Sequence, residues 1–126
     1  MAEESDVLII GSGIAGAAAA LQLAQDTQRQ IALITREHDP EETTTRYAQG
    51  GIVARGAEDS VDLLVEDVLR TGAGLSLSTA ARVMAEEGPG LVQRVLMDNV
   101  GITFDRGPDR SPNFTREGGH STARVL

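Results

Sequence analysis

The stretch "DVLIIGSGIAGAAAALQLA", residues 6–24, decides the fold of this chain. It begins with a short, continuous apolar run, Val7–Ile10, which is typical of a strand buried on both faces. Glycines interrupt that run, and the alanine- and leucine-rich residues 15–24 that follow favour a helix. A second apolar run comes at residues 31–34. The sequence therefore predicts a β-α-β unit with a right-handed crossover.

The turn between the first strand and the helix carries a G-x-G-x-x-G motif. Its glycines have separate tasks: Gly11 permits a tight turn, Gly13 lets backbone approach a diphosphate, and Gly16 lets the helix pack closely on the sheet. The diphosphate would lie at the helix N-terminus, where N–H groups and the helix dipole favour anions. The alternative is a glycine-rich turn without a ligand, but the strand before and the helix after favour a dinucleotide site. The residues predicted to bind the cofactor here are Gly11, Ser12, Gly13, Ile14, Ala15 and Gly16.

The end of the second strand departs from the usual dinucleotide pattern. An acidic residue about 20 positions after the glycines normally binds the ribose hydroxyls. Thr35 occupies that position here, and Glu37 follows two residues later. We expect the Thr35 hydroxyl and the Arg36 guanidinium to contact the cofactor, and Glu37 to be either a ribose ligand or a solvated side chain.

A long loop is predicted for residues 36–58, because they lack periodicity and include a charged connector with a proline. Apolar residues then recur at helical spacing over residues 61–69. Asp59 or Ser60 is expected to cap this helix and Gly72 to end it. Its apolar stripe is expected to form core rather than an interface.

Two more helices are predicted after Gly72. Ser78 is expected to cap one that ends near Gly88, and Pro89 to open another that ends near Gly101. Short strands are expected at residues 52–54 and 102–104.

Composition excludes several classes of protein. The net charge of −8, from 19 acidic and 11 basic residues, opposes non-specific binding to nucleic acid or to an anionic membrane. The chain has no cysteine, and its histidines, His38 and His120, lack metal-ligand spacing. The polar, acidic N-terminus does not have the form of a signal peptide, so we expect a cytoplasmic protein without a bound metal.

Three motifs together carry a family resemblance. "DVLIIGSGIAGAAAALQLA" (6–24), "YAQGGI" (47–52) and "TREGGHS" (115–121) resemble, in the same order, segments of the flavoproteins related to succinate dehydrogenase and fumarate reductase. Within that group, the sequence is most similar to the branch of L-aspartate oxidases. The resemblance implies an α/β fold: the N-terminal βαβ part of a Rossmann-like FAD-binding domain, with a following helical segment.

The resemblance also implies the chemistry. Family members of the aspartate-oxidising branch oxidise L-aspartate to iminoaspartate, the first step of quinolinate and NAD biosynthesis, with oxygen or fumarate as electron acceptor and quinolinate synthase as a candidate partner. Dehydrogenases of the group bind FAD covalently through a histidine that would fall near Thr44 or Thr45 here, so non-covalent FAD is expected. The alternatives are a related fumarate reductase or succinate dehydrogenase, and a non-catalytic dinucleotide-binding module.

The expected extent of the domain follows from the same resemblance. Residues 1–126 would be the N-terminal portion of an FAD-binding domain, without the capping domain and the C-terminal parts. No catalytic residue of the family falls within them, so this portion alone is expected to be inactive.

Two segments are then assigned to ligands. In "TREGGHS", Glu117 and His120 are expected to bind the substrate, with Glu117 facing the α-amino group of aspartate; the alternative is that Glu117 pairs with Arg116 or Arg124 on a solvated loop. The second segment lies in the predicted loop over residues 36–58. It is expected to contact FAD through Thr44, Thr45, Arg46, Tyr47, Ala48, Gln49, Gly50 and Gly51.

Overall fold

The computed structural model describes residues 4–26 and 28–126 of the chain. It divides into two compact units, Met1–Gly50 and Gly51–Leu126, which are described separately here.

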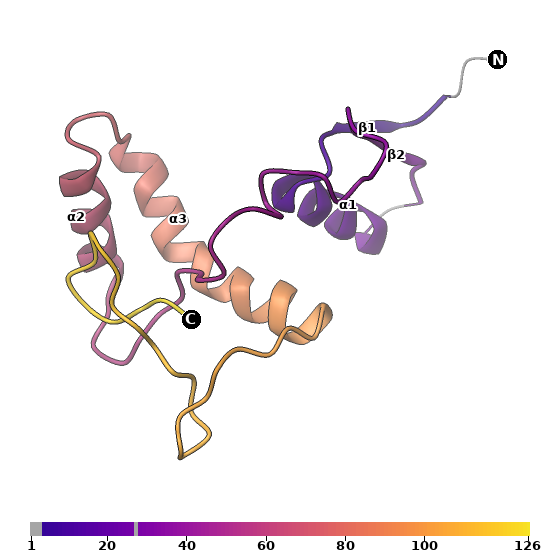
Figure 1. The fold of residues 1–126 in the computed structure, drawn as a ribbon. Coiled ribbons are helices and arrows are strands. Elements are labelled where there is room, and N and C mark those ends of the chain that lie inside the picture. The colour runs from indigo at the N-terminus through magenta and orange to yellow at the C-terminus, as the bar shows by residue number, and fades with distance from the viewer. Residues whose placement is uncertain (1–3, 27) are drawn as a thin grey trace. The chain divides into compact units, whose positions relative to one another are not determined.

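The first unit contains the predicted β-α-β motif. Strands β1 (Val7–Ile10) and β2 (Ile31–Ile34) pair in parallel, and helix α1 (Ile14–Asp26) connects them and packs against both (Figure 1). Val7 lies opposite Ile31, and Ile10 lies opposite Ile34. The predicted elements of this unit are confirmed, but the expected burial of the first strand on both faces is not: Leu8 and Ile10 are 54% and 80% exposed in β1.

The second unit begins with the predicted amphipathic helix, α2 (Val61–Thr71). Ser60 caps it: its backbone is extended, and its hydroxyl oxygen accepts a hydrogen bond from the Leu63 N–H at 3.1 Å. Gly72 is the C-terminal cap, as expected, but it keeps a right-handed conformation with φ −71°. The left-handed residues come next, at Ala73 and Gly74, with φ of 47° and 88°.

Helix α3 (Ser78–Leu91) lies beside α2 and forms the core of the second unit with it (Figure 1). Leu64 and Val65 of α2 are buried against Ala81 and Ala85 of α3. The small alanines let the two helices approach closely. The stripe over residues 61–69 is therefore core, as predicted.

The prediction that Pro89 opens a separate helix is wrong. Helix α3 continues through Pro89 and passes into a π-helical segment, η1 (Val92–Asn99). Proline has no N–H, so the carbonyl four residues earlier loses its helical donor. That carbonyl belongs to Ala85, and the Arg55 side chain donates a hydrogen bond to it instead.

Three smaller expectations also need correction. Ser78 does not cap α3, since it is already helical; the cap residue is Leu77, which has no side chain able to accept a hydrogen bond. Residues 102–104 form no strand, because the chain turns back on η1, with Ile102 N–H donating to the Leu96 carbonyl at 2.9 Å. Residues 52–54 pair only through an isolated antiparallel bridge between Val53 and Val125.

Candidate cofactor and substrate sites

The glycine turn has the geometry that the motif requires. Gly11 has a φ of +108°, which only glycine adopts readily. A Cβ at Gly16 would overlap the Gly11 carbonyl oxygen and approach Ile9 Cγ2 to 3.3 Å. Gly16 therefore permits close packing of α1 on β1, as predicted.

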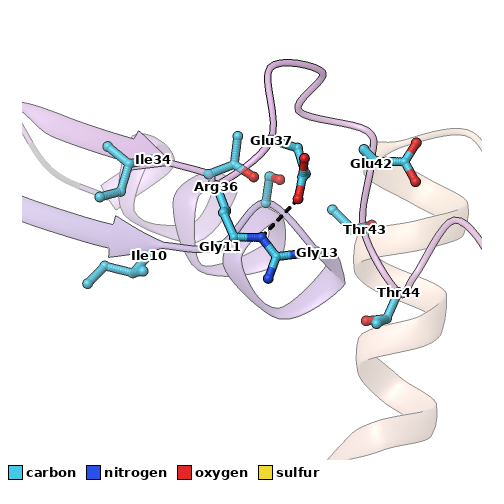
Figure 2. Close-up of a pocket in the computed structure, with 11 residues that line it drawn as sticks. Ile10, Gly11, Gly13, Ile34, Arg36, Glu37, Glu42, Thr43 and Thr44 are labelled. Atoms are coloured by element: carbon cyan, nitrogen blue, oxygen red, sulfur yellow. Dashed lines mark hydrogen bonds and ion pairs between the residues drawn. The ribbon is translucent and has the colours of Figure 1, made fainter.

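A cavity of about 470 Å³ lies at the carboxyl ends of β1 and β2 (Figure 2). This is where ligands bind in parallel α/β sheets. The hydroxyl oxygen of Ser12 is buried beside it and has no hydrogen-bond partner among residues 4–26 and 28–126. Such a group normally has a partner, so a ligand with a polar group would satisfy it. The cavity is lined by Ile10, Gly11, Ser12, Gly13, Ile34, Thr35, Arg36, Glu37, Glu42, Thr43 and Thr44.

The start of α1 meets one of the predicted threonines. The Ile14 N–H donates to the Thr45 hydroxyl oxygen at 3.1 Å, and a Cβ on Gly13 would lie 3.1 Å from the same oxygen. Thr45 thus covers the helix N-terminus, while Thr44 lines the cavity itself. Ala15 belongs to the first turn of α1, although it does not line the cavity.

The segment after β2 also reaches the cavity. Thr35 and Arg36 line it, as expected of cofactor contacts. Glu37 lines it too, and its carboxylate accepts a hydrogen bond from Arg36 Nε at 2.8 Å (Figure 2). The Arg36 side chain is 92% exposed, so this pair contributes little to stability.

Sequence reasoning missed Glu42. It lines the cavity and accepts a hydrogen bond from the Tyr47 hydroxyl, which raises the pKa of Tyr47. Arg46 Nη1 forms ion pairs with Asp39 Oδ2 at 3.4 Å and with Glu42 Oε2 at 3.5 Å. The acidic connector Glu41-Glu42 before the threonines was the available signal. Arg46, Tyr47, Ala48, Gln49 and Gly50 do not line the cavity, and their flavin contacts stay predictions.

The second unit brings Gly51 and Glu117 together. A Cβ built on Gly51 would lie 3.1 Å from Glu117 Oε1 and 2.8 Å from Val125 Cγ1. The expected alternative, an ion pair of Glu117 with Arg116 or Arg124, does not occur among the described residues. Arg124 is fully buried and pairs with Asp59 and Asp67 instead.

His120 lies in the same segment and is half-buried. Its Nδ1 is 3.3 Å from Arg124 Nη1, and its backbone N–H donates to the Glu117 carbonyl at 3.2 Å. The two predicted substrate residues therefore belong to one turn. Asp59 and Asp67, which hold Arg124, were not predicted as part of this region.

Metal centres and membrane-spanning helices are absent from the part of the chain that the structure describes. It contains no group of three or more histidine, aspartate or glutamate side chains able to hold a metal ion. None of its helices is long and apolar enough to cross a membrane.

Comparison with known proteins agrees with this geometry. Residues 6–126 match the family model described as an FAD binding domain. The chain is 38% identical over 122 residues to the chloroplastic L-aspartate oxidase of Arabidopsis thaliana, covering 96% of this chain and 18% of that protein. It is 36% identical over 122 residues to the L-aspartate oxidase of Streptomyces coelicolor, covering 96% of this chain and 20% of that protein. The chain thus spans about a fifth of the length of these relatives.

A solved structure shares the fold. A variant FrdA chain of E. coli quinol fumarate reductase superimposes with a TM-score of 0.84 at 29% identity, covering 96% of this chain and 20% of that chain. The α/β architecture predicted from the glycine motif is therefore that of a flavoprotein.

Proposed function

We propose that this protein uses FAD to oxidise L-aspartate to iminoaspartate, the first step of quinolinate and NAD biosynthesis. The premise is that the chain belongs to the family of FAD-binding domains. The observation that carries the choice of substrate is the Glu117 carboxylate, which lies beside Gly51 and makes no ion pair among the described residues. The L-aspartate oxidase relatives support the same choice.

The glycine turn would hold the FAD diphosphate. Gly11, Gly13 and Gly16 place no side chain in the turn, and the N-terminus of α1 attracts an anion. Ser12 would donate its unpartnered hydroxyl to a diphosphate oxygen. FAD, when bound, supplies the acceptor for the hydride of the substrate Cα–H bond. Gly13→Val should abolish FAD binding, because a side chain at this position blocks the approach of the backbone to the diphosphate. The same side chain would also crowd the Thr45 hydroxyl, which lies 3.1 Å from a Cβ built on Gly13.

FAD is proposed to bind without a covalent link. The position at which the dehydrogenases of the group carry a histidine falls near Thr44 and Thr45, and a threonine does not form that link. Acid precipitation of the purified protein should release all the flavin into the supernatant. Flavin that stays with the pellet would contradict this part of the proposal.

Glu117 is proposed to recognise the α-ammonium group of aspartate. A carboxylate facing an ammonium forms a charge-assisted hydrogen bond, which belongs to the strong class. Succinate and fumarate have no such group, so the contact would select aspartate over these dicarboxylates. His120, in the same turn, is proposed as a second substrate contact.

Comparing substrates tests the proposal against its closest alternative. Aspartate-dependent flavin reduction, faster than reduction by succinate, is expected of the full-length protein. Faster turnover of succinate would identify a dehydrogenase instead, and reduction of fumarate without any oxidation of aspartate would identify a fumarate reductase. A flavin spectrum without turnover of any of these would identify a binding module.

The remaining parts of the proposal concern the surroundings of the enzyme. Oxygen or fumarate is the proposed electron acceptor, quinolinate synthase a candidate partner, and the cytoplasm the proposed location. Peroxide release compared with succinate formation distinguishes the two acceptors. Co-purification and cell fractionation test the partner and the location.

A further inference from the structure

A buried carboxylate, Asp67, joins helix α2 to the segment that carries Glu117 and His120. Asp67 is 3% exposed. Its Oδ2 accepts hydrogen bonds from the Ser121 N–H at 2.7 Å, the Ser121 hydroxyl at 2.9 Å and Arg124 Nη1 at 2.7 Å. Its Oδ1 accepts one from Arg70. Four donors thus satisfy this carboxylate, three of them on Oδ2 and one on Oδ1.

Arg124 provides the charge that balances this carboxylate. Its side chain has no exposed surface, and it lies between Asp67 and Asp59, with Nη2 2.8 Å from Asp59 Oδ1. The Asp59 contact is an ion pair only, since neither Asp59 oxygen has a hydrogen-bond partner among the described residues. Asp67 therefore makes the aligned bond that fixes the orientation of the guanidinium.

The same cluster holds the turn at residues 117–120. Arg70, already bonded to Asp67, also donates to the Gly119 carbonyl at 2.9 Å. Gly119 has a φ of +86°, and a Cβ there would come within 2.9 Å of Thr71 Cγ2. The turn therefore lies directly on the C-terminal end of α2. Neither Asp67 nor Arg70 is near Glu117 in sequence.

The same arrangement favours one tautomer of the His120 ring. An arginine guanidinium only donates hydrogen bonds, so a bond between Arg124 Nη1 and His120 Nδ1 requires that Nδ1 accept. That contact favours the tautomer whose proton is on Nε2. His120 would accordingly present an N–H donor on the side of the ring away from Arg124.

We propose that Asp67 is a positioning residue for the substrate contacts of Glu117 and His120, acting through Ser121 and Arg124. This inference rests on the proposed function, in which those two residues bind aspartate. Asp67 itself does not contact the substrate. It fixes the turn that carries Glu117 and His120. The consequence is that a helix outside the three sequence motifs sets the geometry of the substrate site.

A double-mutant cycle in the full-length holoenzyme tests this proposal. Asp67→Asn keeps the shape of the side chain but replaces an acceptor by a donor, and a KM for aspartate raised about tenfold or more is expected. Because Asp67 acts by positioning the turn that carries Glu117, adding Glu117→Gln to Asp67→Asn should cost less than the sum of the single losses. Flavin content should not change, and Asp62→Asn, an exposed carboxylate on the same helix, serves as the matched control. Additive losses, or an unchanged KM, would overturn the proposal.

A second measurement requires no turnover. Nitrogen-15 NMR of the wild-type imidazole, assigned with His120→Gln, should show the Nε2–H tautomer alone, and Asp67→Asn should give a mixture of tautomers. A proton on Nδ1 in the wild type would overturn the proposal. If Asp67→Asn does not fold, Ser121→Ala, which removes one of the bonds to Asp67, should give a smaller change in the same direction. The imidazole result stands even if Glu117→Gln leaves aspartate oxidation unchanged, an outcome that would refute the proposed function alone.

Discussion

The Glu117 carboxylate lies beside Gly51: a Cβ at position 51 would come within 3.1 Å of Glu117 Oε1 and within 2.8 Å of Val125 Cγ1. The two residues come from motifs far apart in the sequence. They meet because Ile52 and Leu126 exchange backbone hydrogen bonds of 3.0 Å, which brings the two ends of the second unit together. A side chain at Gly51 of "YAQGGI" would therefore force Val125 or Glu117 to shift, apart from any flavin contact that the motif makes.

The first prediction concerns Glu117→Gln. The substitution keeps the shape of the side chain, removes the charge that in the proposed function would face the ammonium of aspartate, and adds an N–H donor that would oppose it. We expect FAD to stay bound and kcat/KM for aspartate to fall roughly 30-fold. This fall corresponds to a loss of about 2 kcal/mol in transition-state stabilisation. Preference for dicarboxylates without the amino group should rise. Steady-state kinetics with aspartate and with fumarate provide the measurement.

Glu87→Gln is the matched control for this experiment. Glu87 is an exposed carboxylate on helix α3. Its substitution should leave the steady-state kinetics with aspartate and with fumarate unchanged. An unchanged kcat/KM for aspartate in Glu117→Gln would eliminate the proposed ammonium contact.

Ser12→Ala should separate cofactor binding from stability. The Ser12 hydroxyl is buried without a partner among the described residues, so its removal should leave the apoprotein as stable as before or slightly more stable. If the hydroxyl binds the diphosphate, FAD affinity should fall by about 0.5–1.5 kcal/mol. Flavin titration and thermal unfolding of the apoprotein measure the two effects. Ser5→Ala, at an exposed position, should change neither.

Arg55→Met should weaken the helix at Pro89. The Ala85 carbonyl would lose the Arg55 donor that takes the place of the missing proline N–H, in a position where Ala85 is fully buried. A destabilisation of about 1–3 kcal/mol is expected from an unsatisfied buried acceptor. Urea unfolding measures it, and Arg94→Met, at an exposed arginine of η1, is the control. Equal stability of the two variants would show that water satisfies this carbonyl.

Arg55 shows why some elements of the fold could be predicted from the sequence and others could not. The β-α-β unit and the start of α2 depend on neighbouring residues, namely the apolar runs, the glycine turn and the Ser60 cap, so local patterns predicted them. The path of the chain through Pro89 depends on Arg55, which lies 30 residues before Ala85. No local rule predicts that donor.

The candidate sites divide in the same way. The cavity at the glycine turn contains residues that the motif identified, because that motif is contiguous in sequence. Asp67 was not identified, since an acidic residue within an amphipathic helix has the pattern of an exposed side chain. Its partners Ser121 and Arg124 lie more than 50 positions later in the chain. Only the folded structure brings these three residues together.

The last prediction concerns pH. Burial alone would raise the pKa of Asp67, but the hydrogen bonds from Ser121, Arg124 and Arg70 outweigh it and hold that pKa well below its usual range. In the unfolded chain the same carboxyl titrates near pH 4. The folded state therefore binds fewer protons than the unfolded state as the pH falls below about 4–5, and stability contributed by Asp67 decreases there. Above that range the contribution is fully present.

Asp67→Asn should accordingly reduce stability at neutral pH and flatten the decrease in unfolding free energy between about pH 5 and pH 2. Asp62→Asn should keep the wild-type slope, because Asp62 is 76% exposed and pairs with Arg82 at the surface. Urea unfolding of the three proteins across this pH range measures the difference. If Asp67→Asn follows the wild-type slope throughout, Asp67 does not carry the acid sensitivity, and its hydrogen bonds must be weaker in solution than their distances indicate.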